Sequence, residues 1–172
     1  MSIYKYTFKV LLFSHPTVKE EFINKYLQQI FSEDLSLTVG VEFYTKDVQF
    51  SGDTVRLQFW EISESERFRF LIQSYCKGAN GVVLMYDINN SKTLDLLIDY
   101  LQIISKNTGN IPIMLIGNKL YLEESRELSR EVGINIAEKY NLSTYTEIST
   151  KTGQNVENAF QVLTEILINH LK

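Results

Sequence analysis

Residues 14–21, Ser-His-Pro-Thr-Val-Lys-Glu-Glu, follow the apolar run KVLLF and precede a helical pattern. In α/β proteins this is where a glycine-rich loop, G-x-x-x-x-G-K-[ST], binds phosphate through backbone N–H groups, a lysine and a hydroxyl. None of these residues is glycine, and Pro16 has no N–H group to donate. The position therefore favours phosphate chemistry, whereas the residue types do not.

Other chemically active side chains are few. Cys76 is the only cysteine, so an internal disulfide is impossible, and Cys76 with His15 and His170 cannot assemble a zinc site. We expect Cys76 to be a small core residue and His15 to be a solvent-facing loop residue. The mixed charges of residues 123–131 are typical of a solvated face. No nucleophile is paired with a base, so the sequence predicts no catalytic residue and no metal ligand.

Hydrophobic periodicity predicts the elements that would position these residues. Alternating or continuous apolar runs predict strands, and apolar residues three to four positions apart predict helices. The predicted strands are residues 4–13, 41–50, 54–62, 81–88, 111–118 and 143–149, and the predicted helices are residues 19–31, 91–106, 125–140 and 154–171. Ser51, Gly52 and Asp53 predict a tight turn between two antiparallel strands.

Length and composition describe one ordinary domain. The chain has 172 residues, 44% of them hydrophobic, and a formal net charge of −4, so it can bury a core without a disulfide or metal. Interspersed charges give no support for binding nucleic acid. No apolar run reaches the ~18 residues of a membrane-spanning helix, and no signal peptide is recognisable, so we expect a cytoplasmic protein.

Five segments, taken in order, resemble the small GTPases of the Ras superfamily, and most of all the Rab branch. They are KVLLF (9–13), TVGVEFYTK (38–46), LQFWEISESERFRFL (57–71), YCKGANGVVLMYDINN (75–90), and GNKL (117–120) with EISTKTG (147–153). The resemblance covers almost the whole chain. It implies an α/β fold of the G-domain type over residues 1–172, with a mostly parallel six-stranded sheet, one antiparallel hairpin strand and helices on both faces. It also implies GTP or GDP with Mg²⁺ as ligands.

The phosphate loop departs from the family pattern, in which a lysine contacts the phosphates and a serine or threonine holds magnesium. An ungapped alignment places Glu20 and Glu21 at these positions. At ~4 Å and an effective dielectric of ~20, each like-charge contact with phosphate costs ~4 kcal/mol. An alignment with one deletion places Lys19 at the lysine position and Glu20 at the magnesium ligand. Both alignments remain open, and neither restores a glycine.

The second switch also departs from the family. The D-x-x-G motif reads Glu61-Ile62-Ser63-Glu64, and Ser65 stands at the position of the glutamine that orients water. Glu61 could still accept a hydrogen bond from a magnesium-bound water. Glu64 brings a negative charge where the family has a flexible glycine. The resemblance therefore implies that the hydrolytic groups are missing.

The base-binding loops are partly kept. Asn118 and Lys119 match N-K-x-D, but Tyr121 stands where an aspartate reads the guanine edge. Asn118 and Lys119 either brace neighbouring loops, which we favour, or still bind a base. The residues carried over as vestigial nucleotide contacts are Lys19, Asn118, Lys119, Ser149, Thr150 and Lys151.

Three aromatic residues match the platform through which Rab proteins contact effectors: Phe43, Trp60 and Tyr75. Any one of them alone would be read as an ordinary core residue. All three at matching positions favour a partner-binding face, because aromatic anchors dominate interface energetics.

The resulting hypothesis is a Rab-like pseudoGTPase that binds a protein partner through its switch and hairpin face without needing nucleotide, so no cofactor is expected. The alternative is a divergent GTPase that binds GTP or GDP with Mg²⁺ through Lys19, Lys119 and Lys151, with little hydrolysis. A third possibility is a scaffolding subunit of a larger assembly. The final segment, ILINHLK, has no cysteine, so we expect no C-terminal prenyl anchor there. The sequence names neither the partner nor the oligomeric state.

Overall fold

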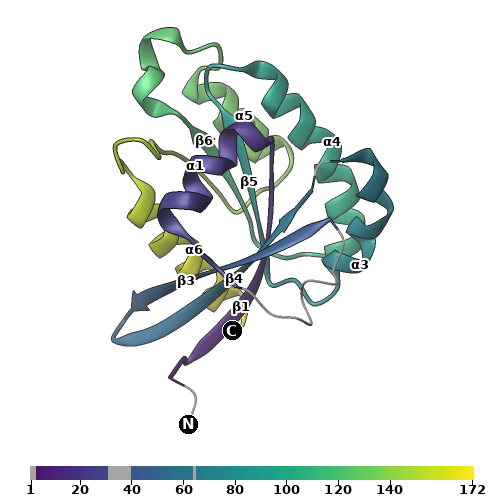
Figure 1. Cartoon of the computed structure of the whole chain (residues 1–172), viewed down its shortest axis with the longest axis vertical. Helices are drawn as coiled ribbons and strands as arrows, with labels where there is room; N and C mark the ends of the chain where they lie inside the picture. The colour runs from purple at the N-terminus through teal and green to yellow at the C-terminus, as the bar shows by residue number, and fades with distance from the viewer. Residues whose placement is uncertain (1–2, 31–39, 64) are drawn as a thin grey trace.

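Alternating strands and helices build a seven-stranded sheet covered on both faces (Figure 1). The computed structural model describes residues 3–30, 40–63 and 65–172. The strands are β1 (Tyr6–Ser14), β2 (Gln28–Gln29), β3 (Val41–Phe50), β4 (Asp53–Ile62), β5 (Gly81–Asp87), β6 (Ile113–Asn118) and β7 (Thr144–Glu147). The helices are α1 (Pro16–Tyr26), η1 (Glu66–Leu71), α3 (Ile72–Cys76), α4 (Ser91–Thr108), η2 (Leu120–Ser125), α5 (Arg130–Lys139) and α6 (Val156–His170).

The sheet has the order β2-β3-β4-β1-β5-β6-β7. Strands β1, β4, β5, β6 and β7 are parallel, and β3 is antiparallel to both β4 and β2. The predicted α/β fold with a mostly parallel sheet is therefore confirmed. The predicted count of six strands is wrong, because Gln28 and Gln29 form a short strand against Thr45 and Tyr44.

That short strand lies inside a segment predicted to be helical, residues 19–31. Helix α1 instead ends at Tyr26, and Leu27 takes an extended conformation with its N–H bonded to the carbonyl of Ile23. Two polar glutamines show no strand alternation, so periodicity alone could not reveal β2.

The hairpin between β3 and β4 has a loop of two residues, Ser51 and Gly52, with φ of 51° and 83°. Positive φ at both positions is the geometry of a type I′ turn, whose twist matches that of the flanking strands. The turn fixes the register in which Phe43 lies opposite Trp60.

The core consists of two clusters, one on each face of the sheet. Side chains alternate along β1, so Val10 and Leu12 join one cluster while Leu11 and Phe13 join the other. Cys76 is buried in the second cluster, as predicted.

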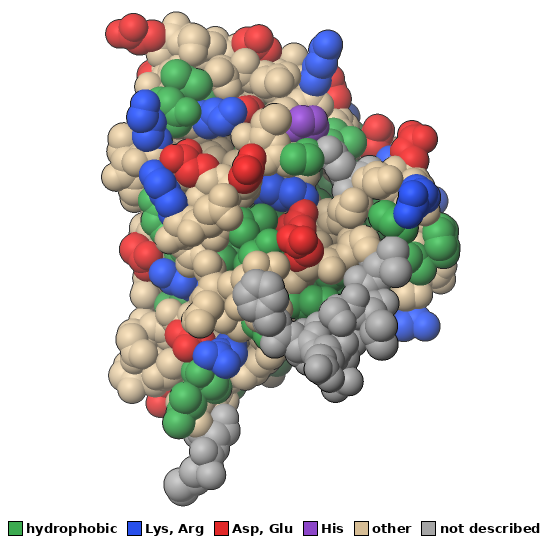
Figure 2. Space-filling model, viewed as in Figure 1, with side chains coloured by type: hydrophobic (Ala, Val, Ile, Leu, Met, Phe, Trp, Pro, Cys, Tyr) green, Lys and Arg blue, Asp and Glu red, His purple; other side chains and the backbone are tan. Residues whose placement is uncertain are grey.

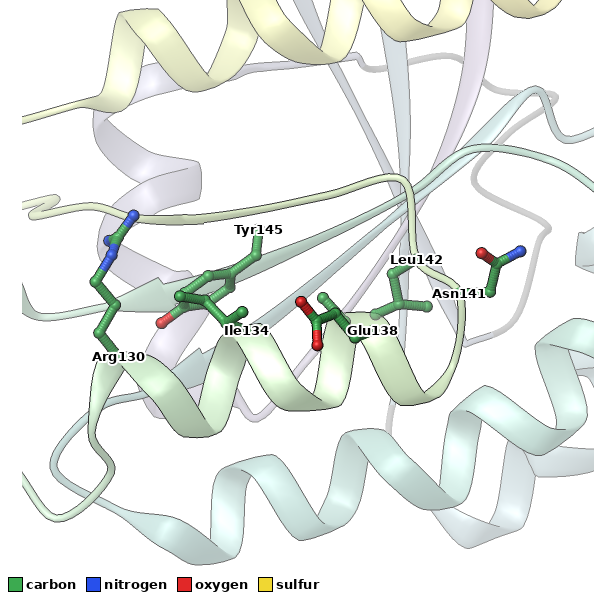
Figure 3. A pocket seen from close by; sticks show the side chains of 7 residues that line it. Arg130, Ile134, Glu138, Asn141, Leu142 and Tyr145 are labelled. Carbon is green, nitrogen blue, oxygen red and sulfur yellow. The ribbon is translucent and has the colours of Figure 1, made fainter.

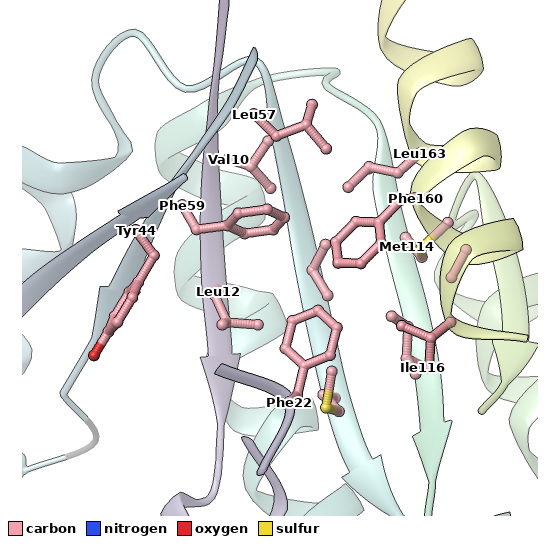
Figure 4. Packing of buried hydrophobic residues seen from close by; sticks show 14 of the residues in the cluster. Val10, Leu12, Phe22, Tyr44, Leu57, Phe59, Met114, Ile116, Phe160 and Leu163 are labelled. Atoms are coloured by element: carbon pink, nitrogen blue, oxygen red, sulfur yellow. The ribbon is translucent and has the colours of Figure 1, made fainter. Parts of the chain in front are cut away.

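The first cluster holds α1 and α6 against the sheet (Figure 4). Phe22 of α1 stacks on Phe160 of α6 at 5.6 Å between ring centroids, and both rings contact Phe59 of β4. Because α1 is anchored this way, the orientation of its polar side chains is set by the core. Within the described residues, no helix is both long and apolar enough to cross a lipid bilayer.

Candidate functional site

Strand β1 leads directly into helix α1 (Figure 1). His15 is the one residue between them. His15 caps the helix: its Nδ1 accepts the Thr17 N–H, and its carbonyl accepts the N–H groups of Val18 and Lys19. Pro16 is the first helical residue and has no N–H group. The N–H groups of Thr17, Val18 and Lys19, at the start of α1, are thus already bonded to His15. His15 thus lies in the loop, as predicted, but it is half-buried and also caps the helix.

Lys19 lies one turn into α1, and its side chain is only 7% exposed. Its Nζ forms an ion pair with Oε1 of Glu61 near the end of β4, where the Glu61 side chain is 13% exposed. The same Nζ also lies 3.4 Å from the carbonyl oxygen of Ile62. Lys19, which one of the two alignments places at the family's phosphate-lysine position, therefore has a carboxylate partner within the chain.

Glu61 also faces a second carboxylate across the hairpin, because Glu42 is its direct cross-strand partner. Like charges directly opposite each other in an antiparallel pair are destabilising. The Tyr44 hydroxyl donates a 2.6 Å hydrogen bond to Glu42, and Lys19 pairs with Glu61, so each carboxylate has its own partner. Burial and the bond to Glu42 raise the pKa of Tyr44 above its usual range. Lys19 thereby links α1 to β4 and offsets the repulsion between the Glu42 and Glu61 carboxylates.

The two glutamates that follow Lys19 do not join this ion pair. Glu20 is exposed. Glu21 turns toward the loop after β7, where it accepts a 2.8 Å hydrogen bond from Thr150 Oγ1 and pairs with Lys25 at 3.0 Å. Hydrogen bonds from Lys25 and Thr150 lower the pKa of Glu21. Of the two alignments, the geometry matches the one that gives Lys19 the lysine position.

Asn118 is fully buried at the end of β6 and joins three segments. Its Nδ2 donates to the carbonyl of Val18 in α1 at 3.1 Å, and its Oδ1 accepts the N–H groups of Lys119 and Thr150. All of these contacts are internal. This arrangement fits the bracing role considered for Asn118 from the sequence.

Lys119 takes a left-handed conformation, φ 68°, and pairs through Nζ with Oδ2 of Asp87 at 2.6 Å. Burial raises the pKa of Asp87, and the hydrogen bond from Lys119 opposes that rise. Tyr121, at the family's base-reading position, is 38% exposed, and the Lys151 ammonium lies 4.8 Å from its ring centroid. Both lysines of the base loops thus have partners inside the chain.

The loop that contains Ser149 and Thr150 is fastened to α1. Both residues are buried, and Ser149 Oγ accepts the Thr152 N–H at 3.1 Å. The carbonyl of Thr150 accepts hydrogen bonds from Lys25 Nζ and Tyr26 Oη, at 3.1 and 3.0 Å. The base-binding loop and α1 are consequently one connected polar unit.

Phe43, Trp60 and Tyr75 form a single aromatic cluster, which we call the platform. Phe43 meets Trp60 edge-on at 4.8 Å between ring centroids, and Trp60 lies 6.3 Å from Tyr75. Phe43 and Tyr75 are 6% and 8% exposed, whereas Trp60 is half-buried. Lys9 places its ammonium 3.6 Å from the centroid of the Trp60 ring. Trp60 is thus the member of the platform most open to a partner.

The segments that resemble the first and second Rab switches are TVGVEFYTK (38–46) and LQFWEISESERFRFL (57–71), and Thr38, Val39 and Glu64 of these segments lie outside the described residues. Gly40 and Ser63, which border these gaps, are hydrogen-bonded to each other: the Ser63 N–H donates to the Gly40 carbonyl at 2.8 Å. Ser65 is exposed, and Phe70 in η1 is 75% exposed. Figure 2 shows acidic and basic side chains interspersed over the face seen in Figure 1, with no stripe of one sign.

The sequence did not predict a buried polar network near η2. Arg126 donates to both carboxylate oxygens of Glu147 at 2.7 and 2.8 Å, and Tyr145 donates to Glu147 at 2.6 Å while its own oxygen lies 2.9 Å from Tyr86 Oη. Burial would raise the pKa of Glu147, but the hydrogen bonds from Arg126 and Tyr145 hold it below its usual value. The prediction that residues 123–131 form a solvated face is therefore wrong for Arg126. A run of mixed charges gave no signal of this pairing.

A groove of about 460 Å³ runs between α5 and β7 (Figure 3). Its lining includes Arg130, Ile134, Glu138 and Tyr145. None of the residues carried over from the family lines it, so the groove is separate from the β1–α1 junction.

Comparison with known proteins identifies the family. Residues 9–169 match the model of the Ras family. The chain is 36% identical over 170 residues to the Ras-related protein Rab-1 of Theileria parva, covering 97% of this chain and 77% of that protein. It is 37% identical over 166 residues to YPTC6 of Chlamydomonas reinhardtii, covering 95% and 76%, and 32% identical over 162 residues to Rab-8A of Bos taurus, covering 93% and 78%. The chain belongs to the Ras family of small GTPases and is Rab-like.

Ras and Rab proteins bind GTP or GDP with Mg²⁺ and contact effector proteins. Family membership alone therefore favours the GTP-binding alternative over the expectation of no cofactor. The described side chains fit these ligands poorly, because Lys19 is paired with Glu61, Lys119 with Asp87, and the first amides of α1 with His15. Family membership therefore favours nucleotide binding, whereas the contacts of Lys19, Lys119 and His15 disfavour it.

Proposed function

We propose that this Rab-like chain is a protein-binding module. The conformation of its switch face, which comprises the β3–β4 hairpin, η1 and α3, is maintained by contacts within the chain and not by a bound nucleotide. The observation that carries the proposal is the buried ion pair between Lys19 and Glu61. In the family a lysine on α1 and an acid at the end of the neighbouring strand meet through phosphate and magnesium. Here the two side chains meet directly. We also propose a cytoplasmic location, in trafficking or signalling assemblies.

Nucleotide binding would have to break the ion pair between Lys19 and Glu61. A phosphate at Lys19 must displace Glu61, which then lies beside both Glu42 and the incoming anion. Separating a buried pair and leaving one charge without a partner costs about 3–5 kcal/mol. That cost weakens binding by roughly two to three and a half orders of magnitude. Affinity in the ordinary range of a small GTPase is therefore not expected.

The platform supplies the surface on which a partner would bind. Phe43 and Tyr75 both contact Trp60, which is half-buried, and Tyr75 lies on α3, which directly follows the η1 helix that contains the exposed Phe70. Large aromatic side chains carry most of the free energy of many interfaces. The ordered, already packed cluster would lose little conformational entropy when a partner binds.

The divergent GTPase remains the second candidate, and the family assignment favours it. In that case Lys19 would leave Glu61 for the phosphates, Glu61 would face magnesium, and Lys119 and Lys151 would flank the base. The two candidates differ in whether partner binding depends on the nucleotide.

The test compares partner capture from source lysate with GDP and with a non-hydrolysable GTP analogue, both with Mg²⁺. Wild type should recover the same proteins in equal amounts under both conditions, and Trp60→Ala should lose them. Tyr140→Ala is the matched control and should keep them. Tyr140 is also a half-buried aromatic residue, but it lies at the C-terminal end of α5 and is not part of the platform. Recovery that depends on the bound nucleotide, or that survives in a well-folded Trp60→Ala variant, contradicts the proposal.

A further inference from the structure

We propose that the partner presents an acidic side chain to Lys9, against the Trp60 ring. The inference deepens the proposed function and rests on the platform being a protein-binding surface. It concerns Lys9, the first residue of the Rab-like segment KVLLF in β1, which is neither a nucleotide-binding residue of the family nor part of the platform. The proposed contact is a carboxylate of the partner, beside an apolar side chain of the partner.

The structure holds Lys9 firmly in place. Asn80 brackets its backbone, because Asn80 Oδ1 accepts the Lys9 N–H at 2.7 Å and the Asn80 N–H donates to the Lys9 carbonyl at 2.8 Å. The Lys9 Nζ donates to the carbonyl oxygen of Lys77 at 2.7 Å and lies 3.6 Å from the Trp60 ring centroid. An ammonium over an indole face is a favourable cation–π contact. The charge is therefore fixed on the platform and not free to swing into solvent.

Lys9 differs from the other partly buried lysines. Lys19 and Lys119 each have a carboxylate partner, Glu61 and Asp87. No aspartate or glutamate within residues 3–30, 40–63 and 65–172 forms an ion pair with Lys9. Burial lowers the pKa of Lys9, which is the expected direction for an ammonium that lacks a compensating anion.

An ammonium has three donors, and one carbonyl together with one ring face does not satisfy them all. A partner that covers Trp60 removes water from Lys9, and an uncompensated charge in an interface weakens binding. A carboxylate placed beside the indole replaces that water with a charge-assisted hydrogen bond. Lys77, which is exposed next to Lys9, adds a second positive charge and disfavours a basic contact. The favoured occupant is thus an acidic residue flanked by apolar anchors.

The chain offers a built-in reporter, because Trp60 is its only tryptophan. Helical peptides are selected from a randomised display library against the full-length wild-type protein. Those that change Trp60 fluorescence are then titrated against Lys9→Met, which keeps the aliphatic stem over the ring and removes the charge. Lys139→Met is the control, since Lys139 lies 5.3 Å from the Tyr140 ring on α5, away from the platform. Each variant is first checked for a cooperative melt.

The expected result is enrichment of aspartate or glutamate in the selected peptides, with binding at least tenfold weaker to Lys9→Met and unchanged to Lys139→Met. Replacing the enriched acid by lysine in a peptide should abolish binding to wild type. Peptides that perturb Trp60 yet bind Lys9→Met within twofold of wild type overturn this inference and leave the platform intact. If no selected peptide perturbs Trp60, the platform is not a binding surface, and the proposed function fails together with the inference.

Discussion

Replacing Lys19 by methionine removes the cation that neutralises Glu61 while keeping most of the buried hydrocarbon. The two side chains are 7% and 13% exposed, so the remaining carboxylate stays largely desolvated and directly opposite Glu42. We predict a loss of about 3–5 kcal/mol in the free energy of unfolding. With a typical urea dependence of ~2 kcal/mol/M, the midpoint falls by roughly 2 M.

The assay is urea denaturation followed by circular dichroism, in buffer without nucleotide or magnesium. Lys46→Met is the control, because Lys46 pairs with Glu157, which is 69% exposed, and such a surface pair contributes about 0–1 kcal/mol. The double variant Lys19→Met/Glu61→Leu should recover most of the loss, since no charge is left unpaired. If Lys19→Met unfolds at the wild-type midpoint without nucleotide but loses stabilisation by GTP and Mg²⁺, Lys19 is a phosphate ligand and the ion-pair argument is refuted.

Three further predictions concern other parts of the chain. Phe43→Ala removes a ring that is 6% exposed and should cost about 3–5 kcal/mol by urea denaturation, whereas a cost below about 1 kcal/mol would show that Phe43 is not packed as described. Arg126→Met leaves Glu147 without its guanidinium partner. Because folding lowers the pKa of Glu147, the variant should lose the most free energy of unfolding above pH 4.5, and this loss should shrink as the pH falls below 4.5. A loss that is independent of pH contradicts the network. Wild type should release no phosphate from GTP above the buffer rate, because the family's water-orienting position holds Ser65; turnover that disappears in Glu61→Ala would contradict this.

Strand positions were predictable because side-chain alternation and turn chemistry are local properties. The hairpin is the clearest case, since Ser51 and Gly52 adopt the two positive φ angles that a two-residue loop requires. The parallel strands followed from their continuous apolar runs, which need cover on both faces. Strand β2 could not be found in this way, because Gln28 and Gln29 pair with β3 only after α1 has ended at Tyr26.

The candidate site was predictable as a list of positions but not as a set of contacts. Periodicity could not show that Glu21 turns to Thr150 while Lys19 turns to Glu61, because the direction is set by the packing of Phe22 into the core. The pairing of Arg126 with Glu147 was hidden for the same reason, since the two residues are brought together only when β7 adds to the sheet. Long-range ion pairs depend on tertiary structure, and a single sequence carries no local sign of them.

The central claim is that the chain's own ion pair, and not a nucleotide, holds the switch face. The most direct test is the unfolding of freshly purified wild type with and without 1 mM GDP or GTP and Mg²⁺, alongside anion-exchange chromatography of a denatured extract. We predict no nucleotide peak and an unchanged midpoint, corresponding to a Kd no tighter than about millimolar, or ~−4 kcal/mol. A stoichiometric GDP or GTP peak, or stabilisation of about 2.7 kcal/mol as expected at 100 times Kd, would contradict the claim.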